Sequence, residues 1–420
     1  MFALVDANSF YCSAEQVYRP QWRKKPVIVL SNNDGCIVSA NRLAIQAGIK
    51  KFVPYFQMKE LCRQKGVIVC SSNYELYADL SAKMMQLIGQ FASQQRVYSI
   101  DESFLHFADG DSRLSLSHIQ QRMLLLRRTI WKELRLPVSV GVANTLTLAK
   151  AANHIAKQSI DYQGVCCLGL DNDPITLLSH MDVGSVWGIG RKTAAKLKQI
   201  KIFTALQLAQ FPPKEARKRF SIDVERTIRE LNGERCIEWQ QVRAPKQQIC
   251  SSRSMGERIT DFHSLQQALC KHAGIAAAKA RADGLNCAVV MAFASNSPHD
   301  IRPQRYRMQH QFVVPTNDTA IITKAVYDGC KQLYKPGVGY YKLGIGLLGL
   351  EPVLHQQFDL FAKDKSNSKL MGAYDAINHK YGTDTVFMAA QGINPKWGMR
   401  RDFLTPKYTT KWQDIPKIRC

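Results

Sequence analysis

Three acidic residues at the ends of apolar segments are the part of this sequence best suited to chemistry. Asp6 directly follows the apolar residues 2–5, and Asp101 and Glu102 are neighbours within residues 98–104. A short apolar run is typical of a buried strand, so we expect Asp6 where that strand meets solvent. Adjacent residues of a straight strand point to opposite faces. We therefore expect Asp101 and Glu102 at the bend of a hairpin, between a strand through residues 97–101 and its partner at 103–107.

Carboxylates that converge in this way need positive charge nearby, because an unpaired buried carboxylate is costly. Hard oxygen ligands suit Mg²⁺, which usually keeps water and substrate phosphates in its coordination shell. Phosphoryl transfer assisted by two metal ions is the chemistry that such a cluster suggests. For any single Asp at the end of a strand, a turn-forming or surface-pairing role is the ordinary alternative.

The size and composition of the chain indicate a soluble multidomain protein. Its 420 residues are enough for two to four domains with their own cores, and no apolar run approaches the length needed to cross a bilayer. The twelve cysteines form no Cys-x-x-Cys pair, so we expect no zinc site and reduced thiols in a cytoplasm. Residues 1–5 lack the basic start of a signal peptide.

The charge balance indicates a polyanionic partner. Lys and Arg number 57 against 34 acidic residues, which gives a formal net charge of +23. Phosphate neutralisation by such a surface supplies affinity that falls as salt rises. Anionic membrane is the rival partner, but no long basic amphipathic helix supports it, so nucleic acid is favoured and no membrane contact is expected.

The segments around the acids read as an α+β core. We expect strands at 27–30, 36–39 and 137–142, helices at 41–47 and 55–64, and a long amphipathic helix at 116–134. Strands and helices of this kind share one sheet that carries the acids.

A second motif is suited to binding a phosphate backbone. Gly188 and Gly190 flank Ile189 in residues 186–197 and lead into a helix with Lys192, Lys196 and Lys198. A tight glycine turn at the start of a helix leaves backbone N–H groups free to face a phosphate. The pattern predicts a helix-hairpin-helix, with an ordinary turn between two helices as the alternative.

Beyond a polar linker at 241–248, residues 249–351 read as two strand-helix-strand halves. The arginines placed to contact phosphates there are Arg253, Arg258, Arg302, Arg305 and Arg307. Each of them alone is more often a solvated surface residue.

Three of these segments together resemble the catalytic motifs of a known family. Residues 6–15, 99–103 and 140–150, continued to Lys157, resemble those of the Y-family translesion DNA polymerases, most closely the UmuC type. The resemblance runs along the whole chain and implies an α+β, multidomain right-hand polymerase. Its implied parts are a palm (1–10 and 73–168), fingers (11–72), a helical thumb with the helix-hairpin-helix (169–240), the linker (241–248), a βαββαβ little finger (249–351) and a C-terminal tail region (352–420).

The resemblance also implies roles for single residues. Error-prone, template-directed DNA synthesis of the SOS mutagenesis type would use two Mg²⁺ ions held by Asp6, Asp101, Glu102 and the backbone carbonyl of Ala7. The substrates would be primer-template DNA and deoxynucleoside triphosphates, within the bacterial cytoplasm at the nucleoid. Tyr11 matches the position whose ring excludes a 2′ hydroxyl, and Lys157 matches a basic residue that reaches the triphosphate.

One position departs from the pattern of the family. Many relatives carry Arg or Lys where this chain has Ile45, and Ile cannot contact a phosphate. Arg42 lies three residues earlier, on the same face of a helix. We expect Arg42 to reach the triphosphate while Ile45 packs inward, the alternative being that Lys157 makes this contact alone.

The tail carries a candidate docking motif. Residues 357–361 resemble the bacterial sliding-clamp motif, in which Gln357 anchors the peptide and Leu360 and Phe361 fill an apolar pocket. Phe358 stands where Leu is more usual. Residues 370–420 look like the region of this family that contacts accessory partners, here a dimeric processed regulatory subunit and the recombinase filament.

Two other functions use the same features. A two-metal nuclease also needs clustered carboxylates and a basic surface, and a non-catalytic scaffold would need only DNA and clamp binding. Tyr11 and Lys157 favour nucleotide use over hydrolysis, and the complete set of acids argues against a scaffold.

Overall fold

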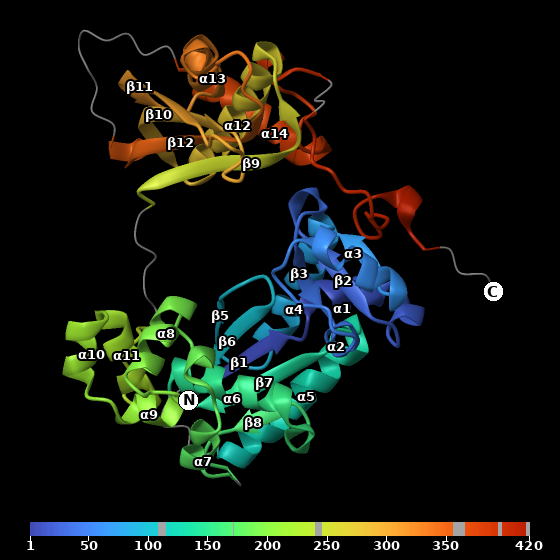
Figure 1. Cartoon of the computed structure of the whole chain (residues 1–420), viewed down its shortest axis with the longest axis vertical. Coiled ribbons are helices and arrows are strands. Elements are labelled where there is room, and N and C mark those ends of the chain that lie inside the picture. The colour runs from blue at the N-terminus through green and yellow to red at the C-terminus, as the bar shows by residue number, and fades with distance from the viewer. Residues whose placement is uncertain (108–114, 171, 240–245, 356–365, 394–396, 417–420) are drawn as a thin grey trace. The chain divides into compact units, whose positions relative to one another are not determined.

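The computed structural model spans the chain and describes all residues except 108–114, 171, 240–245, 356–365, 394–396 and 417–420 (Figure 1). It divides into two compact units, Met1–Gln241 with Asp402–Cys420, and Val242–Arg401. The chain therefore returns to its first unit at the C-terminus. Within the described residues, no helix combines the length and apolarity needed to cross a bilayer.

The core of the first unit is a five-stranded sheet built around the N-terminal strand. The strand order is β5 (Gln94–Val97), β6 (Glu102–His106), β1 (Phe2–Ala7), β7 (Val138–Ala143) and β8 (Val165–Cys167). β1 is buried on both faces because its side chains alternate between two cores. Ala3 and Val5 pack with α4 (Tyr74–Gly89) and α5 (Leu116–Leu134), whereas Leu4 packs with α6 (Leu146–Gln158).

The expected hairpin is present, but its first strand lies earlier in the sequence than predicted. β5 ends at Val97, and residues 98–101 form the bend instead of continuing the strand. The amides of Tyr98 and Ser99 both donate to the Glu102 carbonyl, at 3.0 and 3.1 Å. These local bonds close the turn, so Asp101 lies in the bend and Glu102 begins β6, as expected for acids that act together.

The segment between β1 and α4 carries a small sheet of its own. Its strand order is β3 (Ile37–Ala40), β2 (Val27–Leu30) and β4 (Ile68–Ser71), with α1 (Phe10–Val17), α2 (Arg42–Gln46) and α3 (Tyr55–Gln64) around it. The predicted strands and helices of this region are confirmed to within a few residues. The described cysteines of the chain are all free thiols, and most are buried.

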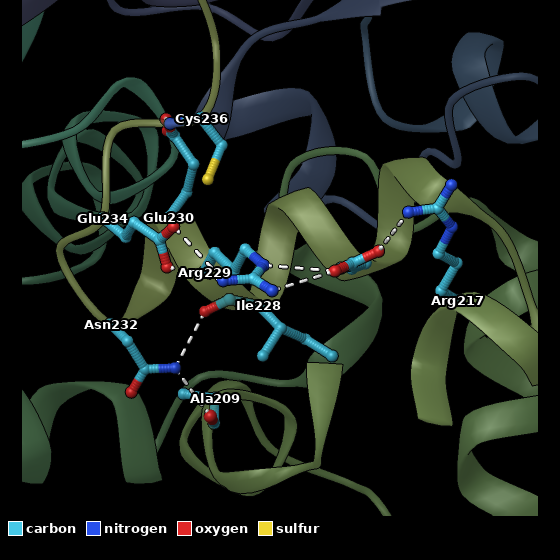
Figure 2. A network of polar contacts seen from close by, with 9 residues as sticks. Ala209, Arg217, Ile228, Arg229, Glu230, Asn232, Glu234 and Cys236 are labelled. Carbon is cyan, nitrogen blue, oxygen red and sulfur yellow. Dashed lines mark hydrogen bonds and ion pairs between the residues drawn. The ribbon is translucent and has the colours of Figure 1, made fainter. Parts of the chain in front are cut away.

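Residues 174–231 form a bundle of short helices joined to α6 through a buried acid. The helices are α7 (Pro174–Ser179), α8 (Arg191–Gln199), α9 (Ala205–Gln210), α10 (Pro213–Arg219) and α11 (Ile222–Leu231). Glu230 of α11 is 1% exposed; its Oε1 accepts from the amide of Cys236 at 3.0 Å and its Oε2 from that of Thr147 at 3.0 Å. Figure 2 shows Glu230 and Cys236 beside the ion pairs of Arg229 on the same helix. Because Thr147 lies in the first turn of α6, Glu230 fixes the start of that helix.

The second unit is a four-stranded antiparallel sheet covered by two helices. Its elements are β9 (Gln248–Ile259), α12 (Phe262–Ala282), β10 (Leu285–Ser295), β11 (Arg305–Thr316), α13 (Thr319–Gly329) and β12 (Tyr340–Pro352). The order β11-β10-β12-β9 places one strand between the two strands of each strand-helix-strand half, which confirms the predicted βαββαβ pattern. A further helix, α14 (Ser368–Tyr381), is held by the bidentate pair of Arg281 with Asp375 at 2.7 Å.

Candidate active site

Strand register brings the three acids to one end of the five-stranded sheet. Asp6 lies directly opposite Glu102 in the antiparallel pairing of β1 with β6. One residue further, the Ala7 amide donates to the Asp101 carbonyl at 2.9 Å. The backbone ladder therefore sets the positions of all three carboxylates before any ligand is present, and it places the Ala7 peptide among them.

Two lysines from α6 neutralise these acids. The Lys157 ammonium lies 2.7 Å from Asp6, and the Lys150 ammonium lies 3.0 Å from Glu102. Both carboxylates are largely buried, with side-chain exposures of 13% for Asp6 and 18% for Glu102. Lys150 also lies over the ring of Tyr98 at 4.5 Å, an added cation–π contact. The pairs supply the positive charge that buried carboxylates require.

Close packing of α6 on the sheet makes these pairs possible. A side chain at Gly141 of β7 would collide with the backbone of α6 at Ala149 and Asn153, so glycine permits the approach. Asn153 is buried, and its amide donates to the Ser139 carbonyl at 2.8 Å. Lys150 and Lys157 are two turns apart on that face, so the helix presents both to the strand ends.

The acids keep an excess of negative charge even with the lysines present. Burial raises the pKa of Asp6 to about 6, and Lys157 lowers it, while Glu102 and Asp101 add to the rise. Among the residues that the structure describes, no three acidic, histidine or cysteine side chains enclose a metal position. Asp6 and Glu102 meet ammonium groups instead, and Asp101 accepts a hydrogen bond from Ser99 at 2.6 Å. Hard carboxylates that gather at one edge and still favour added positive charge fit a divalent cation.

Tyr11 lies next to the acids on the first turn of α1. Ser9, with φ of 46°, turns the chain from β1 into α1 within two residues, and its hydroxyl is held by the Ala40 carbonyl at 3.0 Å. The Tyr11 ring stacks on Tyr77 at 4.5 Å. Burial raises the pKa of Tyr11, and Tyr74 and Asp101 raise it further, as expected for a phenol beside the carboxylates. A ring held in this position can limit the room available for a bound sugar.

The prediction for Ile45 is wrong in one respect. Ile45 is 48% exposed rather than packed inward, because the buried side of the short helix α2 is formed by Ala44. Arg42 is exposed as well, so both residues lie on the open side of α2. The structure leaves Arg42 accessible to a phosphate, and its role stays a prediction.

The predicted helix-hairpin-helix has the expected backbone features. Gly188 has φ of 88°, and Gly190 caps the N-terminus of α8, where an added Cβ would meet no atom within 4 Å. Lys192 is exposed in the first turn of α8 and Lys196 in its last turn, whereas Lys198 is paired with Asp182 at 2.7 Å. The open backbone at Gly190 and the exposed Lys192 beside it suit a phosphate.

The predicted arginines of the second unit do not share one surface. Arg253 is the register partner of the buried Leu343 and affects the pKa of His272 on α12, which places it on the helix-covered face. Arg305 and Arg307 alternate with the buried Met308 and point to the open face. Arg258 is engaged with Asp300 through two bonds of 2.6 Å. The open-face arginines are therefore better placed for phosphates than Arg253 or Arg258.

The predicted clamp motif cannot be compared with the structure, and one lysine at the acids was not predicted. Gln357, Leu360 and Phe361 lie outside the described residues. Lys150, the partner of Glu102, was not among the predicted site residues. Its signal was its spacing of seven from Lys157, which places the two on one side of a helix.

Comparisons with known proteins agree along the whole chain. Residues 5–154 match the impB/mucB/samB family and 246–360 its C-terminal domain, with its helix-hairpin-helix motif at 172–202. Residues 368–418 match a domain of unknown function, DUF4113. The chain is 40% identical to Protein SamB and 38% identical to Protein UmuC, both of Salmonella typhimurium, with 100% of each chain covered. It is 25% identical to DNA polymerase IV of Oceanobacillus iheyensis over 95% of both chains.

Solved structures give the same fold. A Y-family DNA polymerase chimera of Dbh and Dpo4 matches with a TM-score of 0.62 at 18% identity, over 84% of this chain and 100% of that chain. An insertion ternary complex of Dbh DNA polymerase matches with a TM-score of 0.52 at 18% identity, again over 84% of this chain and 100% of that chain.

Proposed function

The chain belongs to the impB/mucB/samB family of Y-family DNA polymerases, and on that basis we propose how its residues extend a DNA primer. The chain is an error-prone translesion DNA polymerase, which adds deoxynucleotides to a primer 3′ hydroxyl. The observation that carries the residue assignment is the register of β1 on β6, with Asp6 opposite Glu102 and the Ala7 amide bonded to Asp101.

Asp6, Asp101, Glu102 and the Ala7 carbonyl are the groups that would hold two Mg²⁺ ions. Metal ions in such a site lower the pKa of the attacking hydroxyl and neutralise charge on the attacking and leaving oxygens. The residues of this chain supply the carboxylate edge, keep it largely buried, and balance it with Lys157 and Lys150.

Lys157 and Arg42 are the proposed contacts of the triphosphate. A positioned cation stabilises the negative charge that grows on the phosphoryl group in the transition state. Lys157 lies at the acids, and Arg42 is exposed on α2. Arg42→Ala should chiefly raise the KM for deoxynucleotides with little change in primer-template affinity; unchanged nucleotide kinetics would remove Arg42 from the site.

Tyr11 is the proposed sugar gate. A ring beneath the sugar would clash with a 2′ hydroxyl, so specificity comes from repelling the wrong substrate. Tyr11→Ala should raise ribonucleotide incorporation more than it lowers deoxynucleotide incorporation in a competition assay. An unchanged sugar preference would make Tyr11 a structural residue only.

The grip on DNA is proposed to come from the thumb and the little finger. Gly188, Gly190, Lys192 and Lys196 would hold the phosphates of the duplex at the helix-hairpin-helix. Among the predicted arginines of the second unit, Arg305 and Arg307 on the open face are favoured. Arg253 lies on the helix-covered face, and Arg258 is paired with Asp300. The net charge of +23 supports a contact that weakens as salt rises.

The proposed protein partners rest on the tail and on family membership. Gln357, Leu360 and Phe361 would dock on the sliding clamp, and residues 370–420 would contact a dimeric processed regulatory subunit and the recombinase filament. DNA synthesis on the bacterial chromosome would place the protein at the nucleoid.

Primer extension with the purified full-length chain tests the proposed chemistry. With Mg²⁺ and deoxynucleotides, a polymerase lengthens a labelled primer, a two-metal nuclease shortens it, and a scaffold only shifts its mobility on a native gel. Longer products that follow the template sequence are the expected result.

A further inference from the structure

The region of unknown function at residues 368–418 is shared between the two units of the molecule. Helix α14 belongs to the second unit, whereas residues 402–416, the C-terminal segment, belong to the first. The segment begins at the edge of the three-stranded sheet. There the Ser71 amide donates to the Phe403 carbonyl at 2.9 Å, and the Phe403 amide donates to the Ser71 hydroxyl at 3.0 Å. The segment thus continues the hydrogen bonding of β4 at its C-terminal end.

The next residues of the segment bind the N-cap of α4. Asn73 is fully buried, and its Oδ1 accepts from the Leu76 amide in the first turn of this helix. Its Nδ2 donates to the Thr405 hydroxyl at 3.0 Å and to the Pro406 carbonyl at 3.2 Å. One side chain therefore serves both the helix and the C-terminal segment, so the segment fixes where α4 begins.

Helix α4 in turn supports the ring of Tyr11. Tyr77 stacks beneath Tyr11 with an angle of 16° between the rings, and Tyr74 meets both rings edge-on. The Tyr77 hydroxyl donates to Oε1 of Glu15 at 2.7 Å, which ties α4 to α1. The aromatic support of Tyr11 is therefore held at both ends, by Asn73 at the helix cap and by Glu15 on the neighbouring helix.

Glu15, which holds the hydroxyl of Tyr77, lies in a closely packed environment. Its side chain is fully buried, and burial raises its pKa to about 7. Hydrogen bonding by Tyr77 opposes this rise, and Oε2 of Glu15 is buried with no hydrogen-bond partner among the described residues. Thr405 itself is 9% exposed, so water does not take over its contacts easily.

Tyr408 anchors the C-terminal segment beyond Thr405, at the end of α1. Its ring stacks on Tyr18, at the end of α1, with 4.8 Å between ring centres. Its hydroxyl accepts from Arg19 Nε at 2.8 Å, and the residue is 6% exposed within the main core of the unit. The segment is thus packed as part of the core, against the two helices that carry Tyr11 and Tyr77.

We propose that the C-terminal segment is a positioning element of the nucleotide pocket, in which Thr405 fixes the Tyr77 support and so sets the Tyr11 ring against the sugar. This inference rests on the proposed role of Tyr11 as the sugar gate. It gives the domain of unknown function an intramolecular role in the choice between deoxynucleotides and ribonucleotides. Thr405, Asn73, Tyr77 and Glu15 act through Tyr11 and do not touch the substrate.

The test compares sugar discrimination in full-length variants. Thr405→Val keeps the shape of the side chain and removes the hydroxyl, and Thr405→Ser keeps the hydroxyl as the matched control. Tyr77→Phe keeps the stacked ring and removes the bond to Glu15. The readout is the ratio of kcat/KM for a deoxynucleotide to that for the matching ribonucleotide, with the melting temperature measured alongside. Loss of one buried hydrogen bond should lower the ratio by about threefold to tenfold in Thr405→Val and Tyr77→Phe, with Thr405→Ser like wild type.

The outcomes separate this inference from the role of Tyr11. If Tyr11→Ala abolishes discrimination while Thr405→Val and Tyr77→Phe keep the wild-type ratio, the segment is only structural and the proposal is overturned. A lower melting temperature at an unchanged ratio overturns it in the same way. If Tyr11→Ala itself leaves the ratio unchanged, the gate assignment fails and the positioning role fails with it. A variant of Thr405 that unfolds is replaced by Asn73→Asp, which keeps the helix cap and removes the donor to Thr405.

Discussion

At the scale of single residues, the site is a balance of charges. Asp6, Asp101 and Glu102 gather at one end of the sheet. Two lysines of α6 form ion pairs with Asp6 and Glu102. In a largely buried ion pair, removal of one partner leaves the other charge uncompensated, which costs more than the pair itself contributes. Lys150 and Lys157 therefore stabilise the unit when no metal is bound, besides any part they take in catalysis.

Lys150→Met should destabilise the first unit by about 2 kcal/mol in denaturant unfolding without metal, because Glu102 loses its only ion-pair partner among the described residues. Millimolar Mg²⁺ should raise the unfolding midpoint of the variant more than that of wild type, because the metal supplies the missing positive charge. The matched control is Lys83→Met, whose exposed pair with Asp79 should contribute less than about 1 kcal/mol. An equal effect of Mg²⁺ on wild type and Lys150→Met would argue against Glu102 as a metal ligand.

The sequence predicted where the acids lie but not which lysines pair with them. Asp6 and Glu102 could be placed because a strand end and a hairpin bend are local features. Spacing places Lys150 on the same helix face as Lys157, but its pairing with Glu102 depends on how closely α6 packs on Gly141, which is a tertiary contact. The inward packing expected of Ile45 was wrong for a similar reason: α2 has only five residues, and Ala44 alone fills its buried side.

At the scale of elements, α12 of the second unit carries a buried histidine under the sheet. His272 is 4% exposed, and its Nδ1 is 2.8 Å from the Ser251 hydroxyl on β9. Burial lowers the pKa of His272 to about 4, and Arg253, Lys271 and Lys279 lower it further. The folded unit therefore holds a neutral imidazole at neutral pH.

Stability of the second unit should fall as pH falls from about 6.5 toward 4. The unfolded chain binds a proton at His272 below about 6.5 and the folded chain does not, so protonation favours unfolding in this window. The expected loss at pH 5 is about 2 kcal/mol. Hydrogen exchange of α12 peptides at pH 7 and pH 5, corrected for intrinsic rates, measures the change. His272→Gln, which cannot titrate, should lose most of this pH dependence; an identical dependence would assign the effect to other groups.

The elements of the second unit were predicted more fully than those around the bend at Asp101. The long alternating strands and the helix at α12 have clear periods, so their bounds follow from the sequence. The first strand of the catalytic hairpin ended early because the Glu102 carbonyl captures the amides of Tyr98 and Ser99. Such turn hydrogen bonds compete with strand pairing, and they produce no alternation of apolar and polar residues that would reveal the turn in the sequence.

At the scale of the whole molecule, the chain combines a first unit with the candidate active site, a second unit with the βαββαβ sheet, and a C-terminus that returns to the first. The βαββαβ pattern and the helix-hairpin-helix could be predicted from periodicity and glycine spacing. The return of residues 402–416 could not, because its contacts with Asn73 and Tyr18 join positions more than three hundred residues apart.

Clamp docking should act on processivity and leave chemistry unchanged. Replacing Gln357, Leu360 and Phe361 together by Ala should keep distributive synthesis and remove stimulation by a loaded clamp, because the motif raises effective concentration at the primer end. Lys363→Ala, just beyond the pentapeptide, is the matched control and should behave as wild type. Surface plasmon resonance on immobilised clamp measures binding, and undiminished binding by the triple variant would rule the motif out.

Primer extension by wild type and Asp101→Asn, with DNA binding measured in parallel, tests the central claim most directly. The substitution keeps a group that can accept the hydrogen bond from Ser99 and removes the negative charge from the candidate metal site. We expect template-directed extension by wild type in Mg²⁺, and by the exposed-acid control Asp79→Asn. For Asp101→Asn we expect a loss of at least about a hundredfold in extension rate, with primer-template affinity unchanged. Extension by Asp101→Asn at the wild-type rate would contradict the assignment of these acids as the catalytic centre.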